Sequence, residues 1–298
     1  MIHGMSTRTG NFPVGLRRGW GDWQKKDLRA FLNWVKQAGF DVVDLMNVTR
    51  EDLSAVREAG LKIGSADLLD FGKIMSSDEG VRRDVIARNV AYVKDLAAAG
   101  AKVFFTCVLP GEPTKPRNEN YKLAVECFAP IARAADETGA TIAIEGYPGG
   151  PPHYAALCCT PETLRAFVRD VGAKSIGVNY DPSHLIRLGV DHVRFLREFV
   201  DRVWHVHAKD TELIDDALYE FGRYQGSAFN KPRGFGEHTW RYTIPGHGVA
   251  RWTEIFSILK QAGYRGAVSV ELEDENFNGS EDGEKRALET SLAYLRAV

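Results

Sequence analysis

The stretch AAAGAKVFFT, residues 97–106, joins the end of a helical pattern, one glycine and a run of β-branched and aromatic residues. Gly100 falls where the C-terminus of a helix needs a residue with positive φ, and the residues after it have the composition of a buried strand. The same pattern recurs along the chain as KQAGFDVVDL (36–45), REAGLKIGSA (57–66), DETGATIAIE (136–145), RDVGAKSIGVN (169–179) and KQAGYRGAVSVE (260–271). A helix followed by a strand, repeated in this way, predicts βα units and a parallel sheet.

Eight segments of the chain have the composition of strands, and helical patterns separate them. The segments are 12–16, 41–45, 61–66, 102–108, 141–146, 175–181, 202–208 and 267–273. Eight strands that alternate with helices predict an α/β fold of the (β/α)8 type, a TIM barrel. We expect residues 1–298 to form a single domain of this kind. Residues 209–250 are expected to form a long inserted loop after the seventh strand that covers the site. Loops of this length are usually functional or disordered, and the aromatic content of this one argues against disorder.

The composition is that of an ordinary globular protein, because 44% of the 298 residues are hydrophobic and 26% are charged. Lysine and arginine total 38 against 40 aspartates and glutamates, and the net charge of −2 gives no electrostatic reason to expect nucleic acid or a membrane as a partner. The sequence shows neither a secretion signal nor a long apolar run, and its four cysteines lack CxxC spacing. We expect a cytoplasmic protein with reduced thiols, and the sequence leaves a homo-oligomer open.

Ionisable side chains fall at the ends of four of the predicted strands. Side chains alternate along a strand, and this period of two points Glu145, Asp181, His207 and Glu271 into the barrel at its C-terminal rim, where TIM-barrel active sites lie. Three carboxylates that face one another without a cation would repel. One divalent ion would remove this conflict. Three carboxylates and one imidazole favour Mn²⁺, with Mg²⁺ or Co²⁺ as alternatives.

Neighbouring polar residues have candidate supporting roles. His205 lies one layer beneath His207 and is expected to support it by hydrogen bonding. Asp210 is expected to fix His207 or Lys209. Lys209 itself begins the inserted loop and is expected to neutralise negative charge that develops on a substrate oxygen.

Three further residues are candidate substrate contacts. Trp20 follows the first strand, and its aromatic face suits the apolar face of a sugar ring. His153 and Arg241 are expected to reach substrate hydroxyls or a phosphate. No glycine-rich phosphate cradle of recognisable spacing is present, so the sequence leaves the phosphorylation of the substrate open.

Four motifs resemble those of the xylose isomerase-like TIM-barrel superfamily. They are IAIEG (142–146), NYDPSH (179–184), HVHAKD (205–210) and SVELED (269–274), in the order of that family. The chain is most similar to the sugar (phosphate) isomerase/epimerase group that includes D-tagatose 3-epimerase, and the resemblance covers nearly the whole sequence. It implies one divalent metal bound by Glu145, Asp181, His207 and Glu271, proton transfer by both glutamates, and contact of His184 with the substrate.

Two positions depart from the ketose 3-epimerases of that group. Pro151 stands where those enzymes have a further glutamate, and Leu213 stands where they have an arginine. The HAKD phrase and the long inserted loop look more like members that act on keto-sugars and keto-glycosides. We therefore expect a substrate larger than a free pentose or hexose, or one that carries an unusual ketone.

These residues predict a divalent-metal-dependent sugar isomerase or epimerase, acting on a ketose or keto-sugar through an enediolate that glutamates form by proton transfer. Return of the proton to the other face gives epimerisation, return to the next carbon gives isomerisation, and loss of a β leaving group gives elimination. The sequence leaves these outcomes open. The alternatives are a 3-keto-glycoside lyase and a non-catalytic sugar-binding barrel subunit. A metal-dependent endonuclease is disfavoured, because eight scattered histidines do not supply its three-metal site.

Overall fold

The computed structural model describes residues 6–151 and 153–298, and eight of its strands close into a barrel in the order β1-β10-β7-β6-β5-β4-β3-β2. The pairs β1–β10, β3–β4, β4–β5, β5–β6 and β6–β7 are parallel. The barrel strands are β1 (Val14–Arg17), β2 (Val42–Leu45), β3 (Lys62–Asp67), β4 (Val103–Cys107), β5 (Thr141–Glu145), β6 (Ile176–Tyr180), β7 (Val203–Ala208) and β10 (Val268–Val270). The predicted (β/α)8 fold is confirmed.

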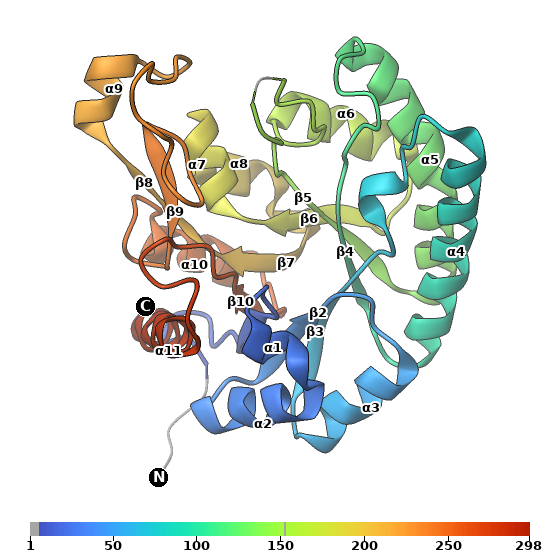
Figure 1. The fold of residues 1–298 in the computed structure, drawn as a ribbon. Coiled ribbons are helices and arrows are strands. Elements are labelled where there is room, and N and C mark those ends of the chain that lie inside the picture. The colour runs from blue at the N-terminus through green and yellow to red at the C-terminus, as the bar shows by residue number, and fades with distance from the viewer. Residues whose placement is uncertain (1–5, 152) are drawn as a thin grey trace. The chain divides into compact units, whose positions relative to one another are not determined.

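Helices lie between the strands along the chain (Figure 1). They are α1 (Asp22–Lys26), α2 (Leu28–Ala38), α3 (Arg50–Glu58), η1 (Phe71–Lys73), α4 (Glu79–Ala98), α5 (Arg117–Thr138), α6 (Pro161–Val171), α7 (Pro182–Leu188), α8 (His192–Phe199), η2 (Val200–Arg202), α9 (Asp215–Phe221), α10 (Trp252–Gln261) and α11 (Glu281–Ala297). Gly39 and Gly139 end α2 and α5 with φ of 96° and 62°, as the recurring helix–glycine–strand pattern predicts.

The first predicted strand begins two residues later than expected. The sequence pattern gave 12–16, whereas β1 runs from Val14 to Arg17. Pro13 has no backbone N–H to donate to a neighbouring strand, which accounts for the later start. Arg17 thus becomes the last residue of a barrel strand.

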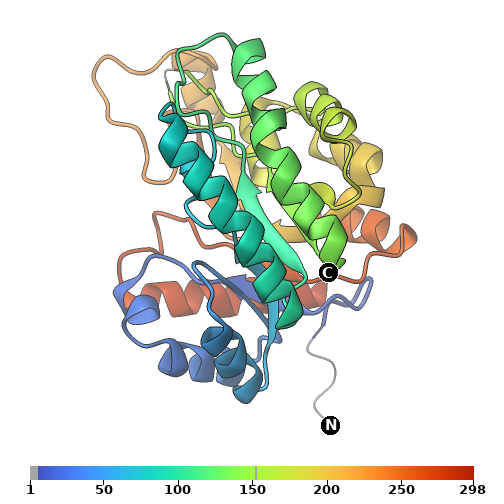
Figure 2. The ribbon, with the colours of Figure 1, turned by 90° about the vertical axis from the view of Figure 1, so that its right-hand side faces the viewer.

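The chain divides into two compact units, of which the second comprises residues 44–180 and 199–206. It contains β3 to β6, and its long helices α4 and α5 lie side by side (Figures 1 and 2). The register of β4 on β5 sets Cys107 beside Glu145, and that of β5 on β6 sets Glu145 beside Asn179. The C-terminal ends of these strands therefore carry polar side chains at the same level.

The first unit comprises the chain up to Val43, Asp181–Glu198 and His207 onwards. In it β1 pairs with β10, with Leu16 beside Val270. The predicted insertion 209–250 contains an antiparallel ribbon of β8 (Asp210–Leu213) and β9 (Trp240–Thr243), and α9 follows β8 (Figure 1). The expected covering role of this segment stays a prediction, as does the single domain.

Among the residues that the structure describes, no helix is both long enough and apolar enough to cross a membrane.

Candidate metal centre

Asp181 follows β6 and caps the N-terminus of α7. Its Oδ1 accepts a hydrogen bond from the Ser183 backbone N–H at 2.8 Å, and Pro182 occupies the first helical position, where a missing N–H has no cost. Its Oδ2 accepts no hydrogen bond and is buried, 3.3 Å from Lys209 Nζ and 3.5 Å from His184 Nε2. The cap therefore fixes one carboxylate oxygen and turns the other towards cationic or ligand atoms.

Glu271 follows β10 and is surrounded by positive groups of the first unit. Its carboxylate lies 2.5 Å from Lys209 Nζ, 3.2 Å from Arg17 Nε and 3.5 Å from His207 Nδ1. Burial alone would raise the pKa of Glu271, but Lys209, His207 and Arg17 outweigh it and hold this pKa well below its usual range. Glu271 is therefore an ionised carboxylate at neutral pH.

Lys209 lies between three carboxylates rather than in solvent. Its exposed fraction is 1%, and Nζ contacts Asp181 and Glu271 as well as Glu273, whose carboxylate is 2.9 Å away. The ammonium also lies over the ring of Tyr242, 4.6 Å from its centroid. A buried lysine held in this way is a fixed positive charge at the rim of the barrel.

Tyr242 connects the insertion with the residues around Asp181. It belongs to β9, and its hydroxyl is 2.6 Å from Nδ1 of the buried His184. Burial raises the pKa of Tyr242 well above its ordinary value, so the phenol stays protonated. His184, which the family resemblance marks as a substrate contact, thus has its ring orientation set by the insertion.

In the second unit, Glu145 ends β5 and is 4% exposed. Its Oε1 accepts a hydrogen bond from Asn179 Nδ2 at 2.8 Å, and its Oε2 lies 3.9 Å from Cys107 Sγ. Both partners sit beside Glu145 in the register of the neighbouring strands. The strand pairing itself therefore orients this carboxylate.

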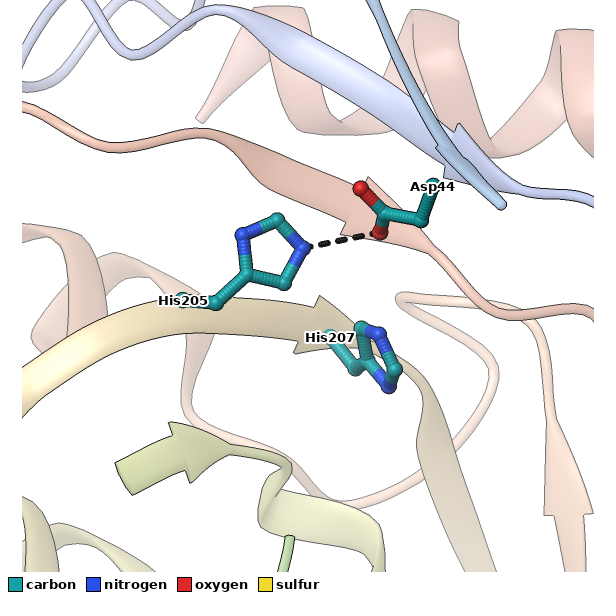
Figure 3. A group of neighbouring side chains, drawn as sticks. All are labelled: Asp44, His205 and His207. Carbon is teal, nitrogen blue, oxygen red and sulfur yellow. Dashed lines mark hydrogen bonds and ion pairs between the residues drawn. The ribbon is translucent and has the colours of Figure 1, made fainter. Parts of the chain in front are cut away.

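His205 has a partner that the sequence patterns did not single out. Its Nε2 lies 2.8 Å from Oδ2 of Asp44 on β2, as the dashed line in Figure 3 marks, and both side chains are buried. The other oxygen of Asp44 accepts a hydrogen bond from the Ser65 backbone N–H at 2.9 Å. His205 is held by this carboxylate, and His207 follows it two residues later on β7.

Within the first unit, the ligand atoms of Asp181, His207 and Glu271 all lie within 4.8 Å of one another. Donors on opposite sides of a Mg²⁺ ion, each about 2.1 Å away, are about 4.2 Å apart, so this donor set nearly matches the coordination of one such ion.

Asp210 and Arg241 both have several partners within the protein. The two carboxylate oxygens of Asp210 accept four hydrogen bonds, from the backbone N–H groups of Thr211, Gly246 and Ala250 and from Trp252 Nε1. The expected support of His207 or Lys209 by Asp210 is absent from these contacts, and the residue instead fastens the end of the insertion to the start of α10. Arg241 is held by carboxylates of the protein itself, namely Glu212, Asp274 and Glu275.

Two other candidate substrate contacts lie at the surface. Trp20 is 55% exposed and lines a pocket of about 490 Å³ together with residues of the first turn of α11. His153 is exposed in the segment that follows β5. Their roles, like those of all the candidate site residues, stay predictions.

Three residues of the candidate site escaped the sequence patterns: Arg17, Asp44 and Glu273. Glu273 lies two residues after Glu271, so the alternation that selected Glu271 also points Glu273 the same way. Asp44 is a charged residue within an apolar strand pattern, which was a usable signal. Arg17 gave none, because it lies one residue beyond the predicted end of its strand.

Comparison with known proteins agrees with this architecture. The family model described as xylose isomerase-like TIM barrel matches residues 22–298. An uncharacterised protein, YfiH, from Bacillus subtilis is 31% identical over 51% of this chain, and the match covers 46% of that protein, so the chain spans less than half of the length of this relative. An inosose dehydratase from Geobacillus thermodenitrificans is 25% identical, over 80% of this chain and 79% of its own length.

Two solved structures share the fold at low sequence identity. A 3-keto-D-glucoside 4-epimerase from E. coli superposes with a TM-score of 0.67 at 18% identity, covering 96% of this chain and 99% of its own. A xylose isomerase-like TIM barrel protein from Mycobacterium smegmatis, in complex with magnesium, gives a TM-score of 0.61 at 17% identity, covering 96% and 98% of the two chains.

Proposed function

The chain belongs to the xylose isomerase-like TIM barrel family, and we propose that it is a divalent-metal-dependent sugar isomerase or epimerase. Its substrate is a ketose or keto-sugar, from which a glutamate removes the proton on a carbon next to the carbonyl. The observation that carries the proposal is the group of Asp181, His207 and Glu271 in the first unit, whose ligand atoms lie within 4.8 Å of one another. We propose Glu145 as the fourth ligand.

The metal ion would be held by these four side chains. Mn²⁺ is our first expectation, and the magnesium in a structural relative supports a hard, oxygen-preferring ion. When bound, the ion supplies Lewis-acid stabilisation of negative charge on the substrate oxygens. The buried Oδ2 of Asp181, which accepts no hydrogen bond, is a suitable ligand atom for it.

Glu271 is our candidate for the base. Its pKa lies well below the usual range because of Lys209, His207 and Arg17, so at neutral pH it is in the form that accepts a proton. After accepting the substrate proton, it becomes an acid next to Lys209 and returns the proton readily. Glu145 is our candidate for the second proton-transfer group, which would make inversion at the carbon possible.

Lys209 is our candidate for stabilising the enediolate. Its ammonium lies 2.5 Å from Glu271 and over the face of Tyr242, away from bulk solvent. A charge that is already fixed in a water-poor site stabilises a developing oxyanion without reorganisation, and such interactions are worth several kcal/mol. His184, oriented by Tyr242, is the candidate for contact with a substrate hydroxyl.

Dehydration is the second candidate function, because a curated relative that matches 80% of this chain is an inosose dehydratase. The first step is the same: a carboxylate removes the proton next to the carbonyl. A hydroxyl on the carbon β to the carbonyl then leaves as water, after taking up a proton. The two functions differ only in whether the enediolate is reprotonated or loses this group.

The test is solvent exchange. The protein is loaded with Mn²⁺, desalted and incubated in D₂O with D-fructose, D-psicose and an inosose, and the sugars are analysed by NMR. We expect deuterium next to the carbonyl and its loss after chelation of the metal. An epimer or an isomer as product supports the isomerase or epimerase, and a 1,2-diketone, formed by tautomerisation of the enol that elimination leaves, supports the dehydratase. Metal-loaded protein that exchanges no proton in any keto-sugar of the panel refutes the proposal.

A further inference from the structure

We propose that the pocket between Trp20, Phe235 and the start of α11 is a second sugar-ring site, which holds an uncharged ring attached to the keto-sugar. The inference rests on the proposed function, because it assigns a place to the non-reacting part of the same substrate. It goes further by naming the substrate as a glycoside rather than a sugar phosphate.

The pocket is built by three segments of the first unit. They are residues 20–23 after β1, Phe235 from the insertion, and residues 278–284 at the start of α11. Its volume of about 490 Å³ is within the range of about 300–1,000 Å³ that small-molecule sites have. A single sugar ring therefore fits inside it.

Two exposed aromatic residues, Trp20 and Phe235, line this pocket. Trp20 is 55% exposed, and Phe235 is 38% exposed. Trp23 also lines the pocket, and the hydrogen bond that its Nε1 donates to Glu284 Oε2 at 2.7 Å holds its ring in place. Exposed tryptophan and phenylalanine in a concave site supply large contact area at small cost in side-chain entropy, which suits the apolar C–H face of a sugar ring.

Phe235 is held in an unfavourable backbone conformation. Its φ is 52°, a left-handed value that is rare for a bulky residue and that persists only where the surroundings impose it. Two hydrogen bonds do so here: the Tyr242 N–H donates to the Phe235 carbonyl at 2.9 Å, and the Gly234 N–H donates to Glu275 at 2.8 Å. Strain of this kind is typical of residues that position a ligand.

The pocket is linked to the candidate active site by short, direct connections. The Tyr242 N–H donates a hydrogen bond to the Phe235 carbonyl. The hydroxyl of Tyr242 is hydrogen-bonded to His184, and its ring packs against the Lys209 ammonium. A second connection runs through β1, because Arg17 Nε lies 3.2 Å from the Glu271 carboxylate. Trp20 comes three residues after Arg17, and three residues of extended chain span at most about 11 Å. One substrate can therefore occupy both places.

The lining of the pocket favours an uncharged ring over a phosphate. In the described chain it has no lysine, arginine or histidine but includes Asp22, Glu281 and Glu284. Two ammonium groups lie close by: Lys25 is 5.8 Å from the centroid of the Trp20 ring, and Lys285 is paired with Glu281 at 2.6 Å. The N-terminus of α11 would by itself attract an anion, but the acidic residues of its first turn already offset this end of the helix dipole. The carboxylates of Asp22 and Glu281 are hydrogen-bond acceptors, which suit the hydroxyl groups of an uncharged ring. Glu284 already accepts hydrogen bonds from Trp23 and Gln24.

Binding is tested first, independently of catalysis. Metal-loaded protein is titrated with cellobiose and with glucose 6-phosphate, and the Kd is followed by ligand-observed NMR. We expect cellobiose to bind and Trp20→Ala to weaken it about ten-fold. The matched control is Phe229→Ala, which removes an aromatic ring of the insertion that is 97% exposed and lies outside the pocket. Equal affinity of Trp20→Ala and wild type for cellobiose overturns the inference.

Exchange in D₂O then compares D-fructose with lactulose, a ketose that carries a second uncharged ring, and with fructose 6-phosphate. We expect kcat/KM to be highest for lactulose, and Trp20→Ala to lower the lactulose-to-fructose ratio about ten-fold. Asp22→Lys should shift preference towards fructose 6-phosphate. A wild-type preference for the phosphate, or equal losses for lactulose and fructose, overturns the inference.

The two proposals fail in different ways. Cellobiose binding that depends on Trp20, together with no exchange of any ketose, refutes the enediolate chemistry and supports the sugar-ring site. Exchange of ketoses without any effect of Trp20→Ala on either assay supports the chemistry and refutes the sugar-ring site.

Discussion

Asp210→Asn tests whether Asp210 serves the metal centre or the architecture of the insertion. Each carboxylate oxygen accepts two hydrogen bonds: Oδ1 from the N–H groups of Thr211 and Ala250, both at 2.8 Å, and Oδ2 from Gly246 N–H and Trp252 Nε1, both at 3.1 Å. Asparagine has only one such oxygen, and its NH₂ group would face two N–H donors.

The cost follows from those two donors. A buried donor left without an acceptor costs about 1–3 kcal/mol, so the loss is about 2–6 kcal/mol. Burial raises the pKa of Asp210, which means that the ionised carboxylate is itself disfavoured by its surroundings. The neutral amide avoids part of that penalty, and we expect a net loss of about 2–4 kcal/mol of unfolding free energy.

The assay is urea unfolding at pH 7, with Mn²⁺ affinity measured by calorimetry on the folded protein. Asp215→Asn, at the start of the exposed helix α9, is the control and should change stability by less than about 0.5 kcal/mol. We expect Asp210→Asn to lower stability and leave the metal affinity unchanged. A ten-fold or larger loss of metal affinity without loss of stability refutes the architectural role.

Three further outcomes are expected. Asp181→Ala should abolish stoichiometric Mn²⁺ binding in elemental analysis, because it removes a ligand without replacement; full retention of the metal would exclude Asp181 from the site. Glu271→Gln should keep the metal but lower deuterium exchange by about 10²-fold or more, whereas Glu273→Gln should cost less; equal rates in wild type and Glu271→Gln would exclude Glu271 as the base. Burial and Arg251 lower the pKa of His192 to about 4, so the unfolded chain takes up this proton first as the pH falls. Stability should therefore drop between about pH 6.5 and 4, and less steeply in His192→Gln; identical pH profiles of Tm would contradict this.

The barrel was predictable from the sequence because its signal is local. Each helix–glycine–strand pattern, such as the one around Gly100, specifies where one element ends and the next begins, and six such patterns among eight predicted strands leave few folds to choose from. The period of two along a strand is equally local. It pointed Glu145 and Glu271 into the barrel without any knowledge of their neighbours, although their roles stay predictions.

Partners from distant parts of the chain depended on the tertiary structure. The contact of His205 with Asp44 joins residues 161 positions apart, and no local pattern relates two such positions. The same holds for Arg17 and Glu271, which become neighbours because β1 pairs with β10.

The insertion shows the difference most clearly. The sequence indicated that residues 209–250 are too long for a plain barrel connection, but composition cannot specify which way a long segment returns. The antiparallel pairing of β8 and β9 brings Arg241 to Glu212 and places Tyr242 against His184 and Lys209. At the end of the insertion, the Ala250 N–H donates a hydrogen bond to Asp210. Periodicity specifies the face on which a side chain lies, whereas its partner is specified by strand register and loop path, which depend on contacts from the whole fold.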